Sequence, residues 1–257
     1  MELLISVRTP SETATALAGG ADIIDAKEPA HGALGPVAPE ILMAIDHSVP
    51  IDRPLSVALG DARSVAGVRA AVSALPLQLR NRAYVKIGLA GVRAGPELRI
   101  LLVAAADAAA SHPAAPRLIP VVYADEEGGE GLGREIRVEA ARVGAAGILV
   151  DTARKDGRTL LDWWPEARLR EWVRAVRGDG LQVALAGSLG LAELKRVAVL
   201  EPDVVGVRGA ACAGGRSGSI EAARVRALRQ AIHPRAGGDR REPQDLRARS
   251  GLHSISK

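Results

Sequence analysis

Short apolar runs rich in Val, Ile and Leu alternate along this chain with longer stretches of helical period. Eight of the short runs are candidate strands. They span residues 2–7, 22–26, 54–59, 83–88, 118–123, 147–151, 181–186 and 203–207. Their nearly continuous apolar character is typical of parallel strands that are buried on both faces.

The stretches between these runs are rich in Ala, Leu and Arg and predict helices. They span residues 11–17, 39–45, 62–75, 95–110, 131–143, 165–176, 189–197 and 219–232, with Ser11 and Ser219 as expected N-caps. Eight strands, each followed by a helix, predict an α/β protein of one domain, a (β/α)8 TIM barrel over residues 1–232. The alternative is an open doubly wound sheet. That fold favours a Gly-rich turn after its first strand, where this chain has SVRTPS.

The length and composition agree with one barrel that has a core of aliphatic side chains. The chain has 257 residues, 47% of them hydrophobic, and no Phe, and barrels of this class have about 250 residues. Few aromatic side chains are available to stack on bases. Of the net charge of +4, residues 233–257 carry +3, from six basic and three acidic residues. The body is therefore nearly neutral, which argues against a nucleic-acid partner.

Residues 233–257 predict a basic, disordered tail, because they hold few large apolar side chains. The alternative is that Leu246, Leu252 and Ile255 dock on a neighbouring subunit, so a homo-oligomer is left open. The N-terminus lacks the basic start of a signal peptide, and no apolar run approaches the ~18 residues of a membrane span. We therefore expect a cytoplasmic protein with no membrane partner.

Metal and cofactor binding have little support in the sequence. The five His residues form no HxH or HExxH pattern, and a single cysteine, Cys212, excludes both an internal disulfide and a CxxC metal knuckle. The glycine-rich GGEGLG at residues 128–133 lacks the spacing of a dinucleotide-binding loop. We predict no metal and no cofactor.

Lysine is rare in this chain, and its positions indicate chemistry. Only five of the 34 basic residues are lysine, and three of these stand at the ends of apolar strand candidates: Lys27, Lys86 and Lys155. Arginine carries a positive charge equally well but stays protonated, whereas lysine becomes a nucleophile when its pKa is lowered. The lysines therefore suggest amine chemistry, such as a Schiff base. The simpler alternative is that they bind a phosphate or pair with a nearby aspartate.

Carboxylates accompany two of these lysines. Asp25 and Lys27 are two residues apart, so on one strand both side chains point to the same side of the sheet. Asp151 and Lys155 are four apart across a turn. A carboxylate beside an amine can orient it or move its proton, and the alternative is a simple ion pair. In a barrel, these strand ends form the active-site face.

Small residues after the last two strands indicate a phosphate site. Gly187 and Ser188 follow strand 7, and Arg208 and Gly209 follow strand 8. Backbone N–H groups in such loops bind phosphate in many barrels, and Arg208 could add a bidentate contact. The long segments 28–37 and 152–165 are expected to fold over the site as lids.

Several motifs together resemble one family, the (5-formylfuran-3-yl)methyl phosphate synthases of methanofuran biosynthesis. They are GGADIIDAKEP (19–29), YVKIGL (84–89), LVDTARKDGRTL (149–160), ALAGSL (184–189) and DVVGVRGAAC (203–212). The resemblance implies a barrel that joins two glyceraldehyde 3-phosphate molecules into a phosphorylated furan aldehyde, releasing phosphate and water. It implies a Schiff base at Lys27, a proton-handling role for Lys86, and further site roles for Lys155, Asp25 and Asp151.

Two other functions stay open at the level of sequence. One is a phosphosugar isomerase or epimerase without imine chemistry, in which the lysines neutralise phosphate. The other is a non-catalytic barrel that binds a sugar phosphate. The polar side chains gathered at predicted strand ends argue against the second function.

Overall fold

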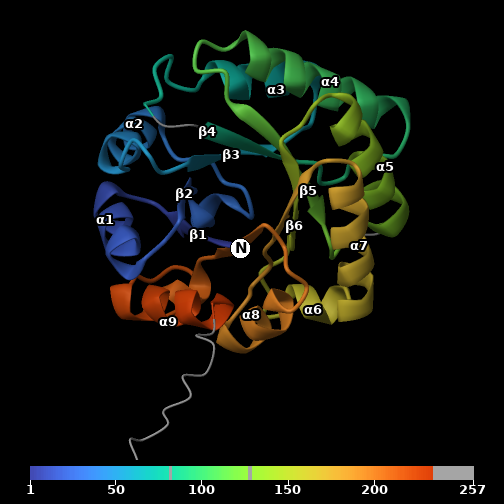
Figure 1. The fold of residues 1–257 in the computed structure, drawn as a ribbon. Coiled ribbons are helices and arrows are strands. Elements are labelled where there is room, and N and C mark those ends of the chain that lie inside the picture. Colours follow the sequence, from blue (N-terminus) through green and yellow to red (C-terminus); the bar gives the residue numbers. More distant parts are fainter. Residues whose placement is uncertain (81–82, 127–128, 234–257) are drawn as a thin grey trace, which may run out of the picture.

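Eight parallel strands close into a barrel in the order β1 to β8, which confirms the predicted TIM barrel. The computed structural model describes residues 1–80, 83–126 and 129–233, so the predicted tail after His233 lies outside the described residues. Figure 1 looks along the barrel and shows the ring of strands surrounded by helices. The strands are β1 (Glu2–Val7), β2 (Ile23–Ala26), β3 (Leu55–Asp61), β4 (Ala83–Gly88), β5 (Arg117–Tyr123), β6 (Gly147–Asp151), β7 (Gln182–Leu185) and β8 (Val204–Val207).

The helices follow the strands in the expected places. They are α1 (Pro10–Gly19), α2 (Pro39–Ser48), α3 (Val65–Ser73), α4 (Pro96–Ser111), α5 (Gly129–Arg142), α6 (Leu160–Trp163), α7 (Glu166–Gly178), α8 (Leu191–Ala198) and α9 (Ala222–Ile232), with two 3-10 turns, η1 (Pro29–His31) and η2 (Gly209–Ala211). Among the described residues, no helix combines the length and apolar character needed to cross a membrane.

Both expected serine caps are wrong. Helix α1 begins earlier, because the Thr9 side chain accepts a hydrogen bond from the backbone N–H of Glu12 and a proline is tolerated in the first turn. Helix α9 begins at Ala222 with Glu221 at its N-cap. The backbone N–H of Glu221 donates a hydrogen bond to the carbonyl oxygen of Ala211, and this contact holds residue 221 in an extended conformation.

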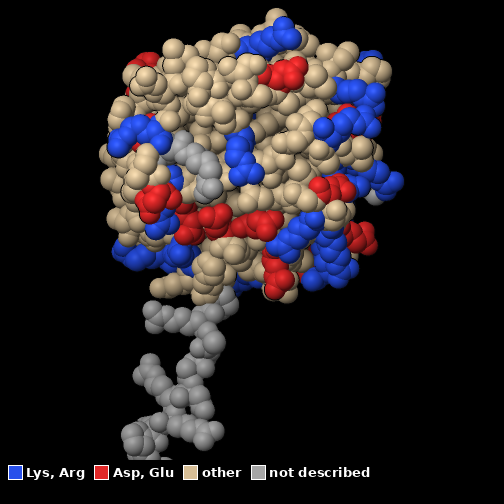
Figure 2. Space-filling view, turned by 45° about the horizontal axis from the view of Figure 1, so that its top comes forward, with Lys and Arg blue, Asp and Glu red and all other residues tan. Residues whose placement is uncertain are grey.

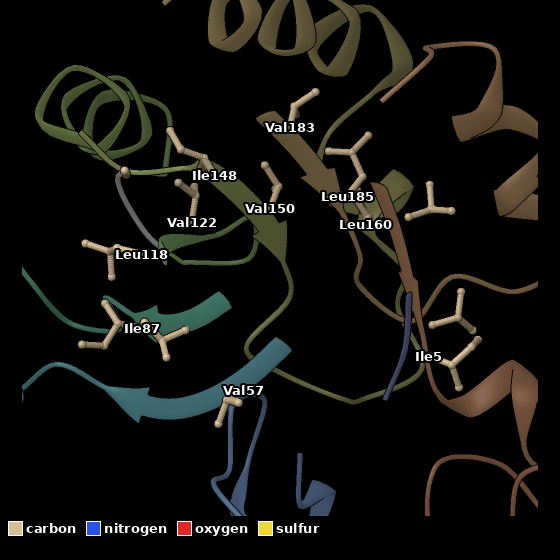
Figure 3. Packing of buried hydrophobic residues seen from close by; sticks show 14 of the residues in the cluster. Ile5, Val57, Ile87, Leu118, Val122, Ile148, Val150, Leu160, Val183 and Leu185 are labelled. Carbon is tan, nitrogen blue, oxygen red and sulfur yellow. The ribbon is translucent and has the colours of Figure 1, made fainter. Parts of the chain in front are cut away.

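The main core lies between the strands and the helices. Outward-facing aliphatic side chains from the strands pack there against apolar helix faces, and the buried cluster includes Leu3, Ile5, Ile24, Leu98, Ile136 and Trp164. Figure 3 shows part of this layer, with Ile5, Val57, Ile87, Val150 and Val183 on different strands. This layer contains most of the buried apolar residues, so the inside of the barrel is available for polar groups.

The inside of the barrel carries small or polar side chains at several positions where large aliphatic residues usually fill a TIM barrel. Ser6, Ser56, Ala184 and Gly206 all line one cavity. At Gly206 an added Cβ would lie 3.2 Å from Cβ of Ala186, so even this position has little spare space. The small residues therefore leave room for a ligand inside the barrel.

Candidate active site

The cavity inside the barrel brings the predicted catalytic residues together. Its volume is about 440 Å³, within the range of about 300–1,000 Å³ that is usual for small-molecule sites. Its lining includes all nine predicted site residues: Asp25, Lys27, Lys86, Asp151, Lys155, Gly187, Ser188, Arg208 and Gly209. Strands β2, β4, β6, β7 and β8 contribute them from their carboxyl ends, where TIM barrels place their active sites.

Asp25 pairs with Lys86 from two strands away. The Nζ atom of Lys86 lies 2.6 Å from Oδ1 of Asp25, and the Ser6 hydroxyl donates to Oδ2 of the same carboxylate at 2.7 Å. The pair spans β3, where Ser56 is the register partner of Asp25 and Ala58 that of Lys86. Because these two residues are small, the Lys86 side chain reaches across them to the carboxylate.

The pKa of Asp25 is lowered from its ordinary value although burial alone would raise it. The charges of Lys86 and Lys27 and the hydrogen bonds from Lys86 and Ser6 outweigh the effect of burial. The carboxylate is fully buried. Asp25 is therefore held as an anion inside the barrel.

A second carboxylate pairs with a lysine on the opposite side of the site. The Nζ atom of Lys155 donates to Oδ1 of Asp151 at 2.9 Å and to the hydroxyl of Thr152 at 3.1 Å. The backbone N–H of Thr152 donates to the same Asp151 oxygen at 2.7 Å. The positive charges of Lys155 and Lys27 and these hydrogen bonds lower the pKa of Asp151 despite its burial. The contact that sequence spacing left uncertain is therefore formed.

Lys27 lies between these two pairs without a carboxylate of its own. Only 8% of the residue is exposed, and within the described residues its Nζ atom forms no hydrogen bond or ion pair. Burial and the charge of Lys86 lower its pKa to about 8, against the opposing effects of Asp151 and Asp25. A sizeable fraction of the amine is therefore neutral near pH 8, which a nucleophilic amine requires.

The predicted phosphate loops lie at the same end of the barrel. Gly187 has a φ of +112° and Ser188 a φ of +52°, and a positive φ is uncommon for serine. An added Cβ at Gly187 would lie 3.1 Å from both Leu160 and Thr152. The exposed Ser188 side chain is thus held at the cavity by a tightly packed turn.

Arg208 lines the cavity, but its guanidinium is bound to other parts of the protein. It forms an ion pair with Glu12 at 2.9 Å and donates to the carbonyl oxygens of Ser6, Arg216 and Gly218. These contacts use both terminal nitrogens and Nε, so the expected bidentate phosphate contact does not fit this arrangement. Arg208 instead fixes the loop after β8 to β1 and α1.

Sequence reasoning missed Arg216, which lines the same cavity. Its Nη2 atom donates to the carbonyl oxygens of Pro29 at 3.2 Å and Gly32 at 2.6 Å, in the segment after β2. The available signal was an arginine directly after the glycine-rich stretch that ends at Gly215. Ser6 was also missed, and its inward position on β1 was the signal for it.

The two expected lids contain short helical turns. The segment after β2 forms η1, and its ends are joined because the backbone N–H of Glu28 donates to the carbonyl of Gly35 at 2.9 Å. Ala33 and Leu34 of this segment are buried in the cluster of apolar side chains inside the barrel. The segment after β6 contains α6. Both segments lie beside the site, and their movement stays a prediction.

The charge around the cavity suits an anionic ligand. At the carboxyl ends of the strands, three lysines and two aspartates leave one positive charge and Arg216 adds a second, while Arg208 and Arg8 share Glu12. Glu2, which also lines the cavity, lies at the opposite end, at the start of β1. Nowhere in the described part of the chain do three or more His, Cys, Asp or Glu side chains gather in a way that could hold a metal ion. On the outer face in Figure 2, basic side chains are interspersed with acidic ones and form no continuous basic area.

The sequence model of the 4-HFC-P synthase family matches residues 3–229. This chain belongs to that family. It is 37% identical over 235 residues to the (5-formylfuran-3-yl)methyl phosphate synthase of Methanothermobacter thermautotrophicus, covering 90% of this chain and 99% of that protein. It is 32% identical to the protein of the same name from Archaeoglobus fulgidus, covering 91% and 100%. A putative synthase from Methylorubrum extorquens is 36% identical, covering 93% of each chain.

Solved structures with the same fold are more distant in sequence. Phosphoribosyl anthranilate isomerase from Thermus thermophilus superposes with a TM-score of 0.59 at 18% identity, covering 91% of this chain and 99% of its own. The 3-hexulose-6-phosphate synthase from Salmonella typhimurium gives a TM-score of 0.56 at 18% identity, with coverage of 91% and 99%. At this identity the likeness concerns the barrel fold alone.

Proposed function

We propose that this chain condenses two molecules of glyceraldehyde 3-phosphate to (5-formylfuran-3-yl)methyl phosphate, through a Schiff base on Lys27. The reaction releases one phosphate and two water molecules, and it makes the enzyme a carbon–oxygen lyase acting on phosphates. Its product would enter the biosynthesis of a methanofuran-type cofactor. The family of the chain supports the overall reaction.

One observation supports the assignment of the Schiff base to Lys27. Its amine lies in the cavity with a pKa lowered to about 8, whereas Lys86 and Lys155 are each bound to an aspartate. The neutral Lys27 amine adds to a substrate carbonyl, and loss of water gives the imine. Once protonated, the imine accepts the electron pair that is left when the α-proton departs, and the resulting enamine attacks the second aldehyde.

Ring closure, dehydration and phosphate elimination then require groups that take and give protons. The pairs Asp25–Lys86 and Asp151–Lys155 flank Lys27 and supply both kinds of group, because each joins an anionic carboxylate to an ammonium. The proposed phosphate contacts are the turn at Gly187 and Ser188 and the backbone at Gly209, which line the cavity beside them. Arg208 would support this phosphate site through the loop that it holds.

The test uses turnover and trapping together. The protein is incubated with glyceraldehyde 3-phosphate, and we expect furan absorbance and inorganic phosphate to appear at equal rates. Borohydride added with substrate should add mass to the peptide that contains Lys27. Lys27→Arg should abolish both results while keeping the fold, because guanidinium stays protonated. Lys195→Arg, on the exposed surface of α8, is the matched control with unchanged turnover.

The outcomes separate the proposal from its competitors. Trapping at Lys86 or Lys155 would overturn the assignment of Lys27. Interconversion of triose phosphates with no trapped adduct and no furan would instead support an isomerase without imine chemistry. Binding of substrate with no conversion at all would support a non-catalytic sugar-phosphate barrel.

A further inference from the structure

Arg216 has a charge that no neighbouring carboxylate balances directly. Within the described residues it takes part in no ion pair, in contrast to Arg208, which is paired with Glu12. Burial lowers its pKa, and the more distant charges of Asp151 and Glu28 act in the opposite direction. An arginine in a cavity with no local counter-charge is suited to bind an anion.

The Arg216 guanidinium is only partly used by the protein. Its Nη2 atom donates to the carbonyls of Pro29 and Gly32, whereas its Nε and Nη1 atoms form no hydrogen bond with a described residue. Because guanidinium has five N–H donors in a fixed plane, Nη2 can hold a loop while the N–H groups of Nε or Nη1 donate to a second group. The Arg216 side chain lines the cavity that contains Lys27 and Ser188.

The backbone around Arg216 is fixed in position. Its carbonyl oxygen accepts a hydrogen bond from Nε of Arg208 at 2.9 Å, and Arg208 is itself held by Glu12. Its backbone nitrogen lies 3.6 Å from where an added Cβ at Gly209 would be. Arg216 therefore lies directly beside the turn after β8, which belongs to the proposed phosphate site.

The loop that Arg216 holds follows directly after Lys27. It runs from Glu28 to Gly35, begins one residue after Lys27, and has its two ends joined by a backbone hydrogen bond. Leu34 in this loop is 2% exposed, and with Ala33 it contacts the apolar cluster inside the barrel. A change in the position of this loop would therefore change the position of Lys27.

We propose that Arg216 is a specificity-determining residue that binds a phosphate group of the substrate through its unused Nε and Nη1 donors while it holds the Glu28–Gly35 loop with Nη2. This inference rests on the proposed function, since a substrate with a phosphate ester is its ligand. Phosphate binding fixes the orientation of Arg216 and so stabilises the loop over Lys27. A triose without phosphate lacks this contact and leaves the loop less firmly held.

The first test measures binding and needs no turnover. Inorganic phosphate is titrated into the full-length protein by calorimetry, and backbone hydrogen exchange is followed in the peptide that contains residues 28–35. We expect phosphate to slow exchange in this peptide. Arg216→Gln should weaken phosphate binding roughly 10- to 100-fold, as expected for the loss of charge-assisted hydrogen bonds, and should remove the protection of the loop.

Two variants make the binding test specific. Arg216→Lys keeps the charge but has a single nitrogen in place of three, so we expect it to recover part of the phosphate affinity and none of the loop protection. Arg174→Gln, on the exposed surface of α7, changes the same residue type away from the cavity and should behave as the unchanged protein. The inference would be overturned if Arg216→Gln bound phosphate with unchanged affinity. It would also be overturned if phosphate bound to the unchanged protein without slowing hydrogen exchange in residues 28–35.

The second test measures turnover. With glyceraldehyde 3-phosphate, Arg216→Gln should raise KM roughly tenfold or more, while borohydride still traps Lys27 at saturating substrate. A variant that lowers kcat alone, with unchanged KM, contradicts a phosphate-binding role. If no furan forms but phosphate protects the loop through Arg216, the proposed function fails and the phosphate contact stands. If furan forms and Arg216→Gln binds phosphate normally, the proposed function stands and the phosphate contact of Arg216 fails.

Discussion

The Nζ atom of Lys86 lies 2.6 Å from Oδ1 of Asp25, and side-chain exposure is only 5% and 0% in this pair. The attraction between the two charges offsets the free energy that each loses on leaving water. Removal of one partner would leave the other buried and unbalanced, which typically costs about 3–5 kcal/mol. The pair is therefore both a catalytic element of the proposed reaction and a point on which the fold depends.

We expect Lys86→Met to lower the free energy of unfolding by about 3–5 kcal/mol, because Asp25 is left as an unpaired buried carboxylate. The double variant Lys86→Met with Asp25→Asn should recover most of this loss, since an amide oxygen can still accept from Ser6. Urea denaturation at pH 7 measures both changes. A double variant no more stable than Lys86→Met would show that the buried charge is not the cause.

The lowered pKa of Lys27 predicts how stability depends on pH. The ordinary pKa of a lysine is 10.5, and that of Lys27 in the folded protein is about 8. Burial and the charge of Lys86 lower it by more than the charges of Asp151 and Asp25 raise it. Below pH 8 the folded protein carries the full penalty of a buried charge, and this penalty disappears as pH rises from about 8 to 10.5. Lys27→Met should therefore stabilise the protein at pH 7 by up to roughly 3 kcal/mol.

At pH 10, Lys27→Met should stabilise the protein by less than about 1 kcal/mol. Urea denaturation at pH 7 and pH 10 measures the two free energies of unfolding. Lys195→Met, at an exposed position, is the control and should change little at either pH. The rate of borohydride trapping at Lys27 should rise between pH 7 and 9, because the neutral amine becomes more abundant. A trapping rate that rises only above pH 10 would contradict the lowered pKa.

Arg208 is predicted to act on stability through Glu12. Arg208→Gln should lower the free energy of unfolding by about 1–3 kcal/mol, because Glu12 loses its buried partner and keeps only the partly exposed Arg8. Glu12→Gln should cause a loss at least as large, since it leaves Arg208 buried without a carboxylate. Thermal and urea denaturation of both variants compare the two losses. A stable Arg208→Gln protein that has lost only its phosphate affinity would favour the direct phosphate contact instead.

Gly88 is predicted to be required by a hydrogen bond at the top of the barrel. The Tyr123 hydroxyl donates to Oδ1 of Asp61 at 2.9 Å, and an added Cβ at Gly88 would lie 1.9 Å from that oxygen. Gly88→Ala should therefore lower the free energy of unfolding by about 1–3 kcal/mol. In an Asp61→Ala background the same change should cost at least about 0.5 kcal/mol less, and equal costs would exclude this contact as the reason.

The sequence by itself determined the fold, and it placed the strand ends to within two residues. Near-continuous apolar runs such as GILV before Asp151 bury both faces of a parallel strand, and that local pattern needs no knowledge of distant contacts. It also placed Asp25 and Lys27 on the same side of β2, because the side chains of a strand alternate. The scarcity of lysine then indicated which strand ends carry amines.

Tertiary structure decided which charges meet. Asp25 binds Lys86 across β3 rather than Lys27 two residues away, because strand register and the small Ser56 and Ala58 leave a path between them. Lys27 thereby stays without its own carboxylate. Glu12 takes the guanidinium of Arg208, 196 residues away in sequence, and leaves Arg216 to face the cavity. Such pairings depend on distances that closure of the barrel sets, and local sequence patterns carry no information about them.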